Sequence, residues 1–466
     1  MSLLDSPKTS GRAESTLFGS ASLCCGALVR VVQARALPFL PKIMNPLFKQ
    51  LSEINERNRG ALSNEDVIVQ EAVLRTLYSV VQTIPQFVTP YLPSFLSTSG
   101  FLSPSIRSHD SLLLLTLKNV DEALATHVAP RHFVPAASSA MSTCVAMTSK
   151  LSLLSMLQSS VENAPNKTAV ALVKPVFGAI TAVFDHEGTF EERLLMTEKG
   201  SDLLHVLVLK LSEVQLRRLF TSLREWRGNL NEETPQAGAA KRLSYWIACS
   251  KLSATLKSIF LPCLSLTFDD AVAELEFAAS CLVKGKRGSK ELDVGSLRTL
   301  RPILLCLERS LNADALQGGS WIRADDNQKY ETLLEPLGKL LEARVPRDSP
   351  VSFEDLVHGE DGGSVVGCLT KLALAGGNEQ LWKPMNYALL EACGNEERAE
   401  VRKAGLLCLL SLVKSLGEEY MVLIPECLPV LSELLEDSNE EIVSLSKEIV
   451  TLSEELIGES LEDSLR

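Results

Sequence analysis

Aromatic residues are scarce in this sequence. Phe, Trp and Tyr make up 5% of its 466 residues, although hydrophobic residues as a whole reach 45% and leucine dominates them. Sheets favour aromatic and β-branched side chains, whereas the apolar stripes of helices are built mainly from leucine. The composition therefore favours an all-α fold.

Long apolar runs are also lacking. No stretch approaches the roughly 18 consecutive apolar residues of a membrane helix. The best run near the N-terminus, residues 23–29, is short, and the polar segment before it contains Asp5 and Glu14. These features are unlike a signal peptide. We therefore predict no membrane partner.

The cysteines form no ligand or disulfide pattern. They number 11, an odd count, and no C-x-x-C pair occurs. Without a secretory signal, this usage indicates a reducing compartment. The adjacent pair Cys24 and Cys25 is predicted to pack rather than to hold a metal. Other cysteines fall on apolar helical stripes, where a free thiol behaves as a small hydrophobic group: Cys249, Cys306, Cys408 and Cys427.

Catalytic motifs are missing as well. The sequence contains no H-E-x-x-H, no G-x-x-x-x-G-K-[ST] and no G-x-S-x-G. The two closest histidines, His127 and His132, are five residues apart and fall on different faces of a helix. The glycine-rich stretch 362–367 follows no predicted strand, so we interpret it as a linker. Carboxylates are expected on solvent faces. We predict a non-enzymatic protein with no cofactor, no metal and no small-molecule substrate.

What the sequence does contain is paired amphipathic helices. In residues 404–436, Leu406, Leu409 and Val413 recur at helical spacing and share one face. Gly417 follows this stripe, where a left-handed cap requires a residue without Cβ. A second stripe then begins and contains Pro425 in its first turn, whereas Pro429 predicts a kink or a later start. Neither helix can bury its stripe alone, which is typical of a repeat unit.

The same plan recurs elsewhere in the chain. Residues 72–96 repeat an apolar helix, a break at Pro85 and a Pro-Tyr-Leu-Pro helix start. Shorter versions of the same sequence pattern occur at residues 37–41, 133–135 and 260–264. The intervals of 52 residues from Pro41 to Pro93 and 42 residues from Pro93 to Pro135 compare with the ~40–47-residue period of HEAT and armadillo repeats. The predicted fold is an α-solenoid of HEAT/armadillo-like helical-hairpin repeats.

Loops and periodicity divide the chain. We predict a disordered segment at 1–20, HEAT-like repeats at 21–227, a helical region at 241–343, and C-terminal repeats at 364–466 that end in an acidic capping helix with a capping box from Ser438 to Glu441. The loop at 228–240 and the connector at 345–363 separate these parts. Apolar periodicity predicts further helices at 111–120, 141–157, 167–185, 203–226, 241–266, 297–311, 331–342 and 368–375.

Charge is unevenly distributed and bears on the partners. Residues 394–466 contain 17 acids and 6 bases, which accounts for −11 of the overall −12. Such a surface repels a phosphate backbone. Residues 210–301 contain 15 bases and 10 acids, including a predicted basic outer face on the helix at 241–266. A loop within them, KGKRGSK, supplies the candidate phosphate contacts Lys284, Lys286, Arg287 and Lys290. The same loop also fits a solvated surface loop or a nuclear-import signal.

The chain resembles a known family in several stretches. They are Leu381-Trp382-Lys383-Pro384, Val401-Arg402-Lys403-Ala404, LGEEYMVLIPECLPVLSELLED at 416–437, LKSIFLP at 256–262, and IPQFVTPYL at 84–92. Together they are similar to the large nucleolar HEAT-repeat proteins of the small-subunit processome, the family of HEAT repeat-containing protein 1 and U3 snoRNA-associated protein 10. The resemblance covers residues 21–466 and matches only the C-terminal part of these several-fold longer proteins. It also marks 241–343 as the helical domain typical of that part.

The resemblance implies a role in ribosome biogenesis. It suggests a nuclear, nucleolar scaffold that acts in pre-rRNA processing, is linked to rRNA transcription, and has other processome proteins and the pre-rRNA/snoRNA particle as partners. No catalytic residues are implied. The alternative is a HEAT-repeat adaptor for nuclear transport or for a phosphatase. A transport adaptor should carry repeated Trp-x-x-x-Asn ladders, and Trp382 with Asn386 is the one occurrence in the sequence.

Overall fold

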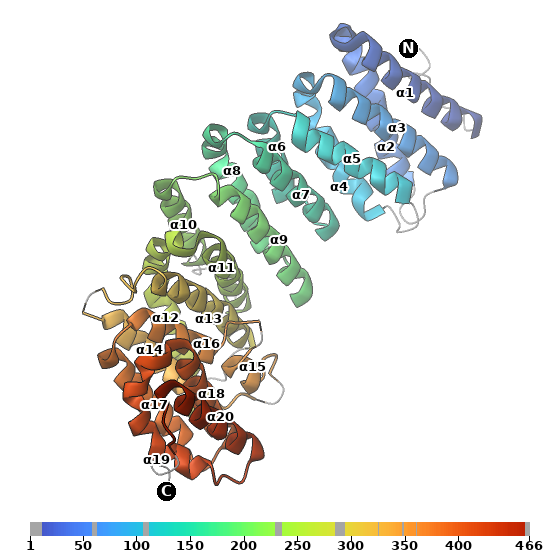
Figure 1. The fold of residues 1–466 in the computed structure, drawn as a ribbon. Helices are drawn as coiled ribbons and strands as arrows, with labels where there is room; N and C mark the ends of the chain where they lie inside the picture. The colour runs from blue at the N-terminus through green and yellow to red at the C-terminus, as the bar shows by residue number, and fades with distance from the viewer. Residues whose placement is uncertain are drawn as a thin grey trace. The chain divides into compact units, whose positions relative to one another are not determined.

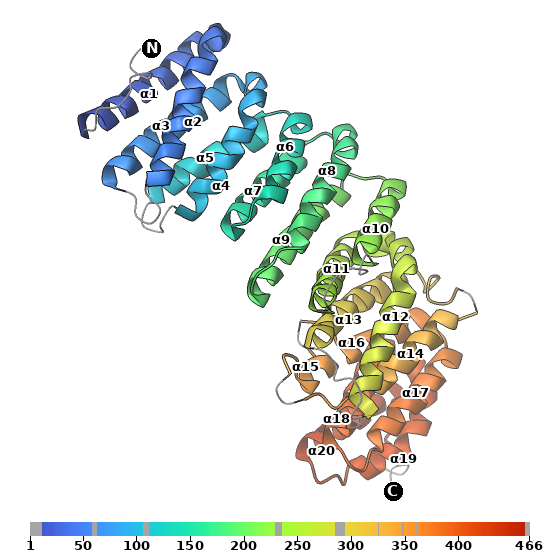
Figure 2. The ribbon, with the colours of Figure 1, turned by 180° about the vertical axis from the view of Figure 1, so that it is seen from behind.

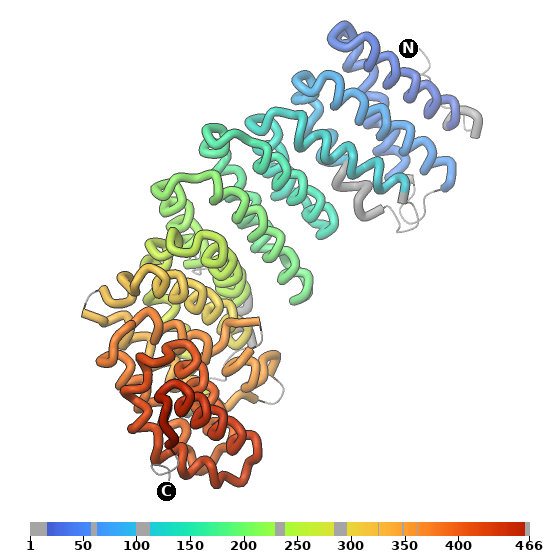
Figure 3. The backbone as a smooth tube through the Cα atoms, in the orientation of Figure 1, coloured from blue at the N-terminus to red at the C-terminus, as the bar shows by residue number. Residues whose placement is uncertain are grey.

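The computed structural model describes residues 12–57, 63–105, 111–228, 235–284, 294–324, 326–346, 349–359 and 361–461. Throughout these ranges the regular elements are α-helices and short 3-10 helices. The chain divides into two compact units, residues 1–219 and 220–466. Figure 3 traces the backbone through both. The predicted all-α fold is confirmed.

The N-terminal unit is a double row of helices. Its members are α1 (Arg12–Val32), α2 (Leu40–Arg57), α3 (Asn64–Thr83), α4 (Leu92–Ser105), α5 (Ser111–His127), α6 (Pro130–Thr143), α7 (Met147–Asn163), α8 (Asn166–Phe184) and α9 (Phe190–Val208). α1, α3, α5, α7 and α9 pack one on the next in the first row, and α2, α4, α6 and α8 do so in the second (Figures 1 and 2). α10 (Glu213–Gly228) crosses the boundary between the two units.

The C-terminal unit has the same plan. Its helices are α11 (Pro235–Leu256), α12 (Leu261–Lys284), α13 (Val294–Ala315), α14 (Gln328–Leu340), α15 (Phe353–Val357), α16 (Val365–Gly376), α17 (Glu379–Cys393), α18 (Ala399–Leu416), α19 (Ile424–Leu434) and α20 (Glu440–Ile457). One row contains α11, α13, α16, α18 and α20, and the other contains α12, α14, α17 and α19. The short α15 packs on α16. Each unit is thus a stack of helical hairpins, and the predicted α-solenoid is confirmed.

An apolar residue followed by proline marks the start of four second-row helices. α2, α4, α12 and α19 begin at Leu40, Leu92, Leu261 and Ile424, and proline is the second residue of each. A proline in the first turn lacks only an N–H that the helix leaves unpaired in any case. Each of these helices follows a 3-10 segment: η2 (Gln33–Phe39), η4 (Thr89–Tyr91, after η3 at Pro85–Phe87), η5 (Lys257–Phe260) or η6 (Gly417–Leu423). Most of these sequence patterns therefore mark one structural position, the start of a second-row helix. The pattern at Pro135 instead lies inside α6.

The apolar stripes form the core. Leu406, Leu409 and Val413 of α18 are at most 1% exposed, as are Ile424 and Leu431 of α19. Fully burying one such side chain stabilises a fold by about 1.5–3 kcal/mol. Gly417 ends α18 with a φ of 57°, so the predicted need for a residue without Cβ is confirmed. α19 does not start late, because Pro429 lies within it.

Several predicted boundaries are wrong. The single helix predicted at 241–266 is divided between α11 and α12 by η5, where Lys257 has a φ of 49°. The helices predicted at 141–157 and 203–226 are likewise each two helices, which part at 144–146 and at 209–212. α1 begins at Arg12, so residues 12–20 of the segment predicted to be disordered are helical. Residues 1–11 lie outside the described ranges.

The capping predictions also need correction. The N-cap of α20 is Asn439, whose side chain accepts a hydrogen bond from the Glu441 N–H, and not Ser438. A capping box is present at the start of α9, where Thr189 and Glu192 exchange side-chain and backbone hydrogen bonds. Residues 185–188 precede this capping box and form part of the connector between α8 and α9. Three polar residues beside a glycine are typical of such a turn.

Three helical segments within the described ranges are long and apolar enough to cross a membrane by length and composition: Thr16–Glu56, Asn166–Phe184 and Gly238–Val283. The first and third each combine two helices and the 3-10 segment between them. The second is α8, whose apolar side chains, among them Leu172, Val176 and Ile180, are buried where α8 packs on α6 and α9. The absence of a membrane partner stays a prediction.

Candidate interaction surfaces

The loop predicted to contact phosphate follows α12. Lys284 is the last residue of that helix, and Lys286, Arg287 and Lys290 lie outside the described residues. The end of α12 is held in place by the connector after α14, because the Arg344 N–H donates to the Leu282 carbonyl at 3.0 Å. This hydrogen bond is an anchor for the C-terminal end of α12.

Arginines fasten the turns beside this anchor. Arg398 donates hydrogen bonds to the carbonyls of Glu342 and Ala343 at 2.8 and 3.0 Å. Arg344 pairs with Glu397 at 3.6 Å. A charged hydrogen bond to a carbonyl at a helix end satisfies an acceptor that the helix itself leaves free. This edge of the C-terminal unit is thus a series of turns that arginine side chains link to one another.

The predicted basic face at 241–266 is largely occupied by contacts within the fold. Arg242 lies 3.6 Å from Glu274, and the Lys241 ammonium lies 5.5 Å from the ring centre of Trp226. Nearby, Arg224 and Arg227 both pair with Asp270, at 2.9 and 3.3 Å. A guanidinium that already faces a carboxylate offers less net charge to a phosphate. The loop after α12, rather than this helix face, is the better candidate for RNA contact.

Lysines bridge the acidic helices at the C-terminal end. Lys403 of α18 contacts Glu354 at 3.3 Å and Glu441 of α20 at 2.7 Å. Lys414 reaches Glu448 of α20 at 2.7 Å. The hydrogen bond and the charge of Lys403 lower the pKa of Glu441 below its ordinary value. Few of the acids gain such a partner, so this end of the chain keeps a strongly negative surface.

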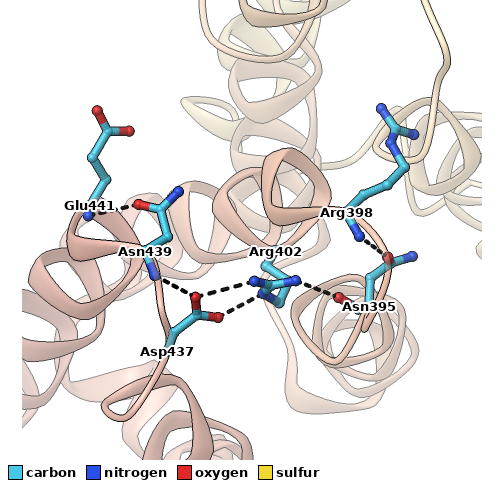
Figure 4. Close-up of polar contacts among 6 residues, drawn as sticks. All are labelled: Asn395, Arg398, Arg402, Asp437, Asn439 and Glu441. Carbon is cyan, nitrogen blue, oxygen red and sulfur yellow. Dashed lines mark hydrogen bonds and ion pairs between the residues drawn. The ribbon is translucent and has the colours of Figure 1, made fainter.

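A largely buried ion pair joins α18 to the turn before α20 (Figure 4). Arg402 of α18 donates to both carboxylate oxygens of Asp437, at 2.8 and 3.1 Å, and to the Asn395 carbonyl at 2.9 Å. Asp437 also accepts from the Asn439 N–H at 2.8 Å. The two side chains are 14% and 8% exposed. The hydrogen bonds from Arg402 lower the pKa of Asp437, so the pair fastens the turn before α20 to α18.

Trp382 and Asn386 point into the fold. Asn386 is fully buried; its amide oxygen accepts from the Tyr420 hydroxyl at 2.6 Å, and its amide nitrogen donates to Glu426 at 3.3 Å. Trp382 is 5% exposed and donates its indole N–H to the Ala373 carbonyl at 2.8 Å. Asn386 thus holds α17 against η6 and α19, and Trp382 holds α17 against α16. They are not available to bind an extended peptide.

Two carboxylates in the described ranges contradict the expectation that all lie on solvent faces. Asp121 of α5 is 8% exposed and accepts a hydrogen bond from the Ser152 hydroxyl at 2.8 Å. Asp314 is fully buried near the end of α13. It accepts hydrogen bonds from the N–H groups of Trp321 and Ile322, both at 2.9 Å. Asp314 therefore orders the loop between α13 and α14, which is a structural task and not a catalytic one.

Most thiols in the described ranges are buried in the core. Cys249, Cys306, Cys368 and others are buried, and burial raises the pKa of Cys306 to about 12. Cys24, predicted to pack, is exposed instead. Within the described ranges, no three His, Cys, Asp or Glu side chains are placed to hold a metal ion. Burial and the neighbouring Lys150 ammonium lower the pKa of His186.

The N-terminal unit contains a groove that the sequence did not predict. It lies over α3 between α1 and α5, and its cavity volume is about 470 Å³. Two arginines, Arg30 and Arg75, and three leucines line it. The available signal was weak: Leu23, Leu112 and Leu115 lie off the buried stripes of their helices and are 43–54% exposed.

The known proteins that are similar to this chain have names consistent with one another. Residues 191–317 match the BP28CT (NUC211) domain family, which overlaps the region predicted at 241–343 and begins before it. The chain is similar to HEAT repeat-containing protein 1 of Homo sapiens, with 27% identity over 465 residues, or 97% of this chain and 20% of that protein. It is also similar to U3 small nucleolar RNA-associated protein 10 of Coccidioides immitis, with 24% identity over 95% of this chain and 24% of that protein.

The resemblance to the nucleolar HEAT-repeat proteins is therefore confirmed by homologues of those names along almost the whole chain. The chain spans about a fifth of the length of the curated relatives it matches. Among solved structures it is similar to the Kap95:Nup1 complex, with 14% identity and a TM-score of 0.37 over 97% of this chain and 56% of that one. A crystal structure of importin beta gives 10% identity and a TM-score of 0.32 over 94% and 62%.

Proposed function

We propose that this chain, a HEAT-repeat solenoid homologous to U3 small nucleolar RNA-associated protein 10, is a non-enzymatic scaffold in ribosome biogenesis. More specifically, it acts in the nucleolar small-subunit processome, in pre-rRNA processing and in its link to rRNA transcription. The observation that carries the proposal is the alignment with those relatives over about 97% of the chain.

The fold supports a scaffold. Two rows of helices bury their leucine stripes against neighbours and present the remaining helix faces and turn edges to solvent. Stacked repeats of this kind offer long surfaces for macromolecules. The non-enzymatic part of the proposal is supported by Asp314, which orders a loop, and by the Cys306 thiol, which burial keeps protonated. The partners that follow from this function are other processome proteins and the pre-rRNA/snoRNA particle.

The experiment that tests the function is affinity purification of the tagged chain from nuclear extract. We expect small-subunit pre-rRNA and processome proteins in the eluate, and nucleolar fluorescence when the chain is fused to a fluorescent protein. Transport factors or a phosphatase, recovered without pre-rRNA, would favour the adaptor alternative. The buried Trp382 and Asn386 weaken that alternative, because they cannot form an exposed ladder.

We further propose that RNA contact is made by the basic loop after α12. Charge reversal of Lys284, Lys286, Arg287 and Lys290 to glutamate should lower pre-rRNA recovery about fivefold or more and leave processome proteins bound. Each phosphate contact on single-stranded RNA steepens the slope of log K against log salt by about 0.7. In direct binding measurements, the slope of log K against log salt should therefore fall by about three.

A matched variant controls for net charge. Lys42, Arg131, Lys167 and Lys174 are exposed and belong to the N-terminal unit, so reversing them changes the total charge by the same amount and leaves the C-terminal unit unchanged. We expect nearly normal pre-rRNA recovery from this variant. Equal recovery from the loop variant and the wild-type chain would remove RNA contact from the loop.

A further inference from the structure

The groove of the N-terminal unit has a floor of small side chains. Gly26 of α1 and Thr76 of α3 meet there so closely that a Cβ on Gly26 would lie 3.2 Å from the Thr76 Cα. Thr76 and Ser79 are 1% and 2% exposed. Because these side chains are short, the surface over α3 lies below the ridges that α1 and α5 form on either side.

Leucines form the two walls. Leu23 of α1 is 43% exposed, and Leu112 and Leu115 of α5 are 52% and 54% exposed. Leu112 and Leu115 are three residues apart, so they lie on one face of α5. Exposed leucines on both sides of one depression form an apolar surface of the kind that marks interaction sites.

The charge of the groove is positive. Arg30 lies along its floor and donates from Nε and Nη2 to the Ser79 hydroxyl at 3.1 and 2.7 Å. No carboxylate in the described part of the chain pairs with Arg30, whereas Arg75 pairs with Glu71 at 2.5 Å. Lys118 stands exposed on α5, one turn from Leu115. The groove thus holds a fixed guanidinium that lacks a counter-charge.

We propose that this groove binds an acidic amphipathic helix of a protein partner. Neighbouring packed helices lie about 8–10 Å apart, so α1 and α5, which flank α3, are about 16–20 Å apart. A helix is about 10–12 Å across with its side chains and fits over α3 between them. Its leucines would contact Leu23, Leu112 and Leu115, and its carboxylates would pair with Arg30 and Lys118.

The lining favours a helix over a nucleic acid. Single-stranded RNA is bound by tracks of cations with aromatic side chains on which bases stack. Tyr78 is the one aromatic residue in the lining, and leucines take the positions on the walls. The groove would accept an acidic helix whatever assembly the chain joins.

The test uses the full chain and a designed probe. The probe is a fluorescein-labelled peptide of about 18 residues with leucines at helical spacing and glutamates beside them. Fluorescence anisotropy should show saturable binding to the wild-type chain. Arg30→Glu and Leu115→Asp should each weaken the affinity about tenfold or more, because one reverses the fixed charge and the other makes a wall polar.

Lys174→Glu is the matched control, since Lys174 is exposed on α8 away from the groove. This variant should bind the peptide as the wild-type chain does. Both groove variants alter exposed side chains, and circular dichroism would verify their folding. The proposal is overturned if a peptide with lysine in place of glutamate binds equally well, if neither groove substitution changes the affinity, or if an oligouridine RNA competes with the peptide.

Discussion

Asp437→Ala should destabilise the C-terminal unit by about 3 kcal/mol, one of the largest effects expected for a single polar side chain. The substitution leaves Arg402, which is 14% exposed, without its bidentate partner and frees the Asn439 N–H. An uncompensated charge in a mostly buried position costs more than the pair itself contributes. Hydrogen exchange of peptides from α18 and α20 measures the loss within this unit.

A nearby ion pair supplies the control. Lys414 and Glu448 also join α18 to α20, at 2.7 Å, but their side chains are 53% and 50% exposed. Glu448→Ala should therefore change the stability by less than about 1 kcal/mol. If the two substitutions have equal effects, burial of the Arg402–Asp437 pair is not what makes it strong.

The same pair gives a pH dependence of known sign. The hydrogen bonds from Arg402 lower the pKa of Asp437 in the folded chain from its ordinary value of 3.8. Its contribution to stability is therefore complete above pH 3.8 and is lost as the pH falls through the folded pKa. The difference in stability between the wild-type chain and Asp437→Ala should shrink below about pH 4. A constant difference down to pH 2 would contradict the assignment.

Asn386→Ala is the second substitution with a large expected effect, a loss of about 2–3 kcal/mol. It leaves the fully buried Tyr420 hydroxyl without its acceptor and opens a cavity between α17 and α19. Burial raises the pKa of Tyr420 far above its ordinary value, so the hydroxyl stays protonated and remains a donor.

A double-mutant cycle separates the hydrogen bond from the cavity. Tyr420→Phe removes the donor and keeps nearly the same volume. Combined with Asn386→Ala, it should restore about 1 kcal/mol relative to the sum of the single changes, because no unpaired hydroxyl remains. Denaturant unfolding monitored by exchange in α17 and α19 gives the four values. A coupling energy near zero would show that the Tyr420–Asn386 bond adds little.

Much of the fold could be predicted from helical periodicity. Leu406, Leu409 and Val413 belong to a stripe that is regular and ends at Gly417, so both the helix and its end followed from the pattern. α8 and α13 were placed within a few residues for the same reason. Prolines at the starts of several helices indicated the repeat. The fixed φ of proline is compatible with the first turn of a helix, whereas proline is unfavourable in the helix interior.

The breaks without glycine or proline could not be predicted in this way. Lys257 adopts a φ of 49° although it is not a glycine. The apolar periodicity of α11 nevertheless continues through this residue into η5. Pro262, the second residue of α12, gave the local sign that a new helix begins there. Phe260 is fully buried in η5 and packs edge-on against Phe220, a tertiary contact that the local sequence does not reveal.

The surfaces were predictable only in part. Net charge identified the acidic C-terminal end, but not that Lys403 and Lys414 would bridge its helices. The basic face at 241–266 was inferred from residue type, yet Glu274 and Trp226 occupy two of its charges. The groove over α3 depends on how three helices align, which side-chain spacing along any one of them does not reveal.

The packing order within each unit also bears on how the chain acquires its structure during synthesis. Helices contact chiefly the next helix in the sequence or the next but one. Each new hairpin can therefore bury its leucines on the previous one soon after it leaves the ribosome, without waiting for distant segments. Each unit can thus fold vectorially, one hairpin after another, as the chain is synthesised.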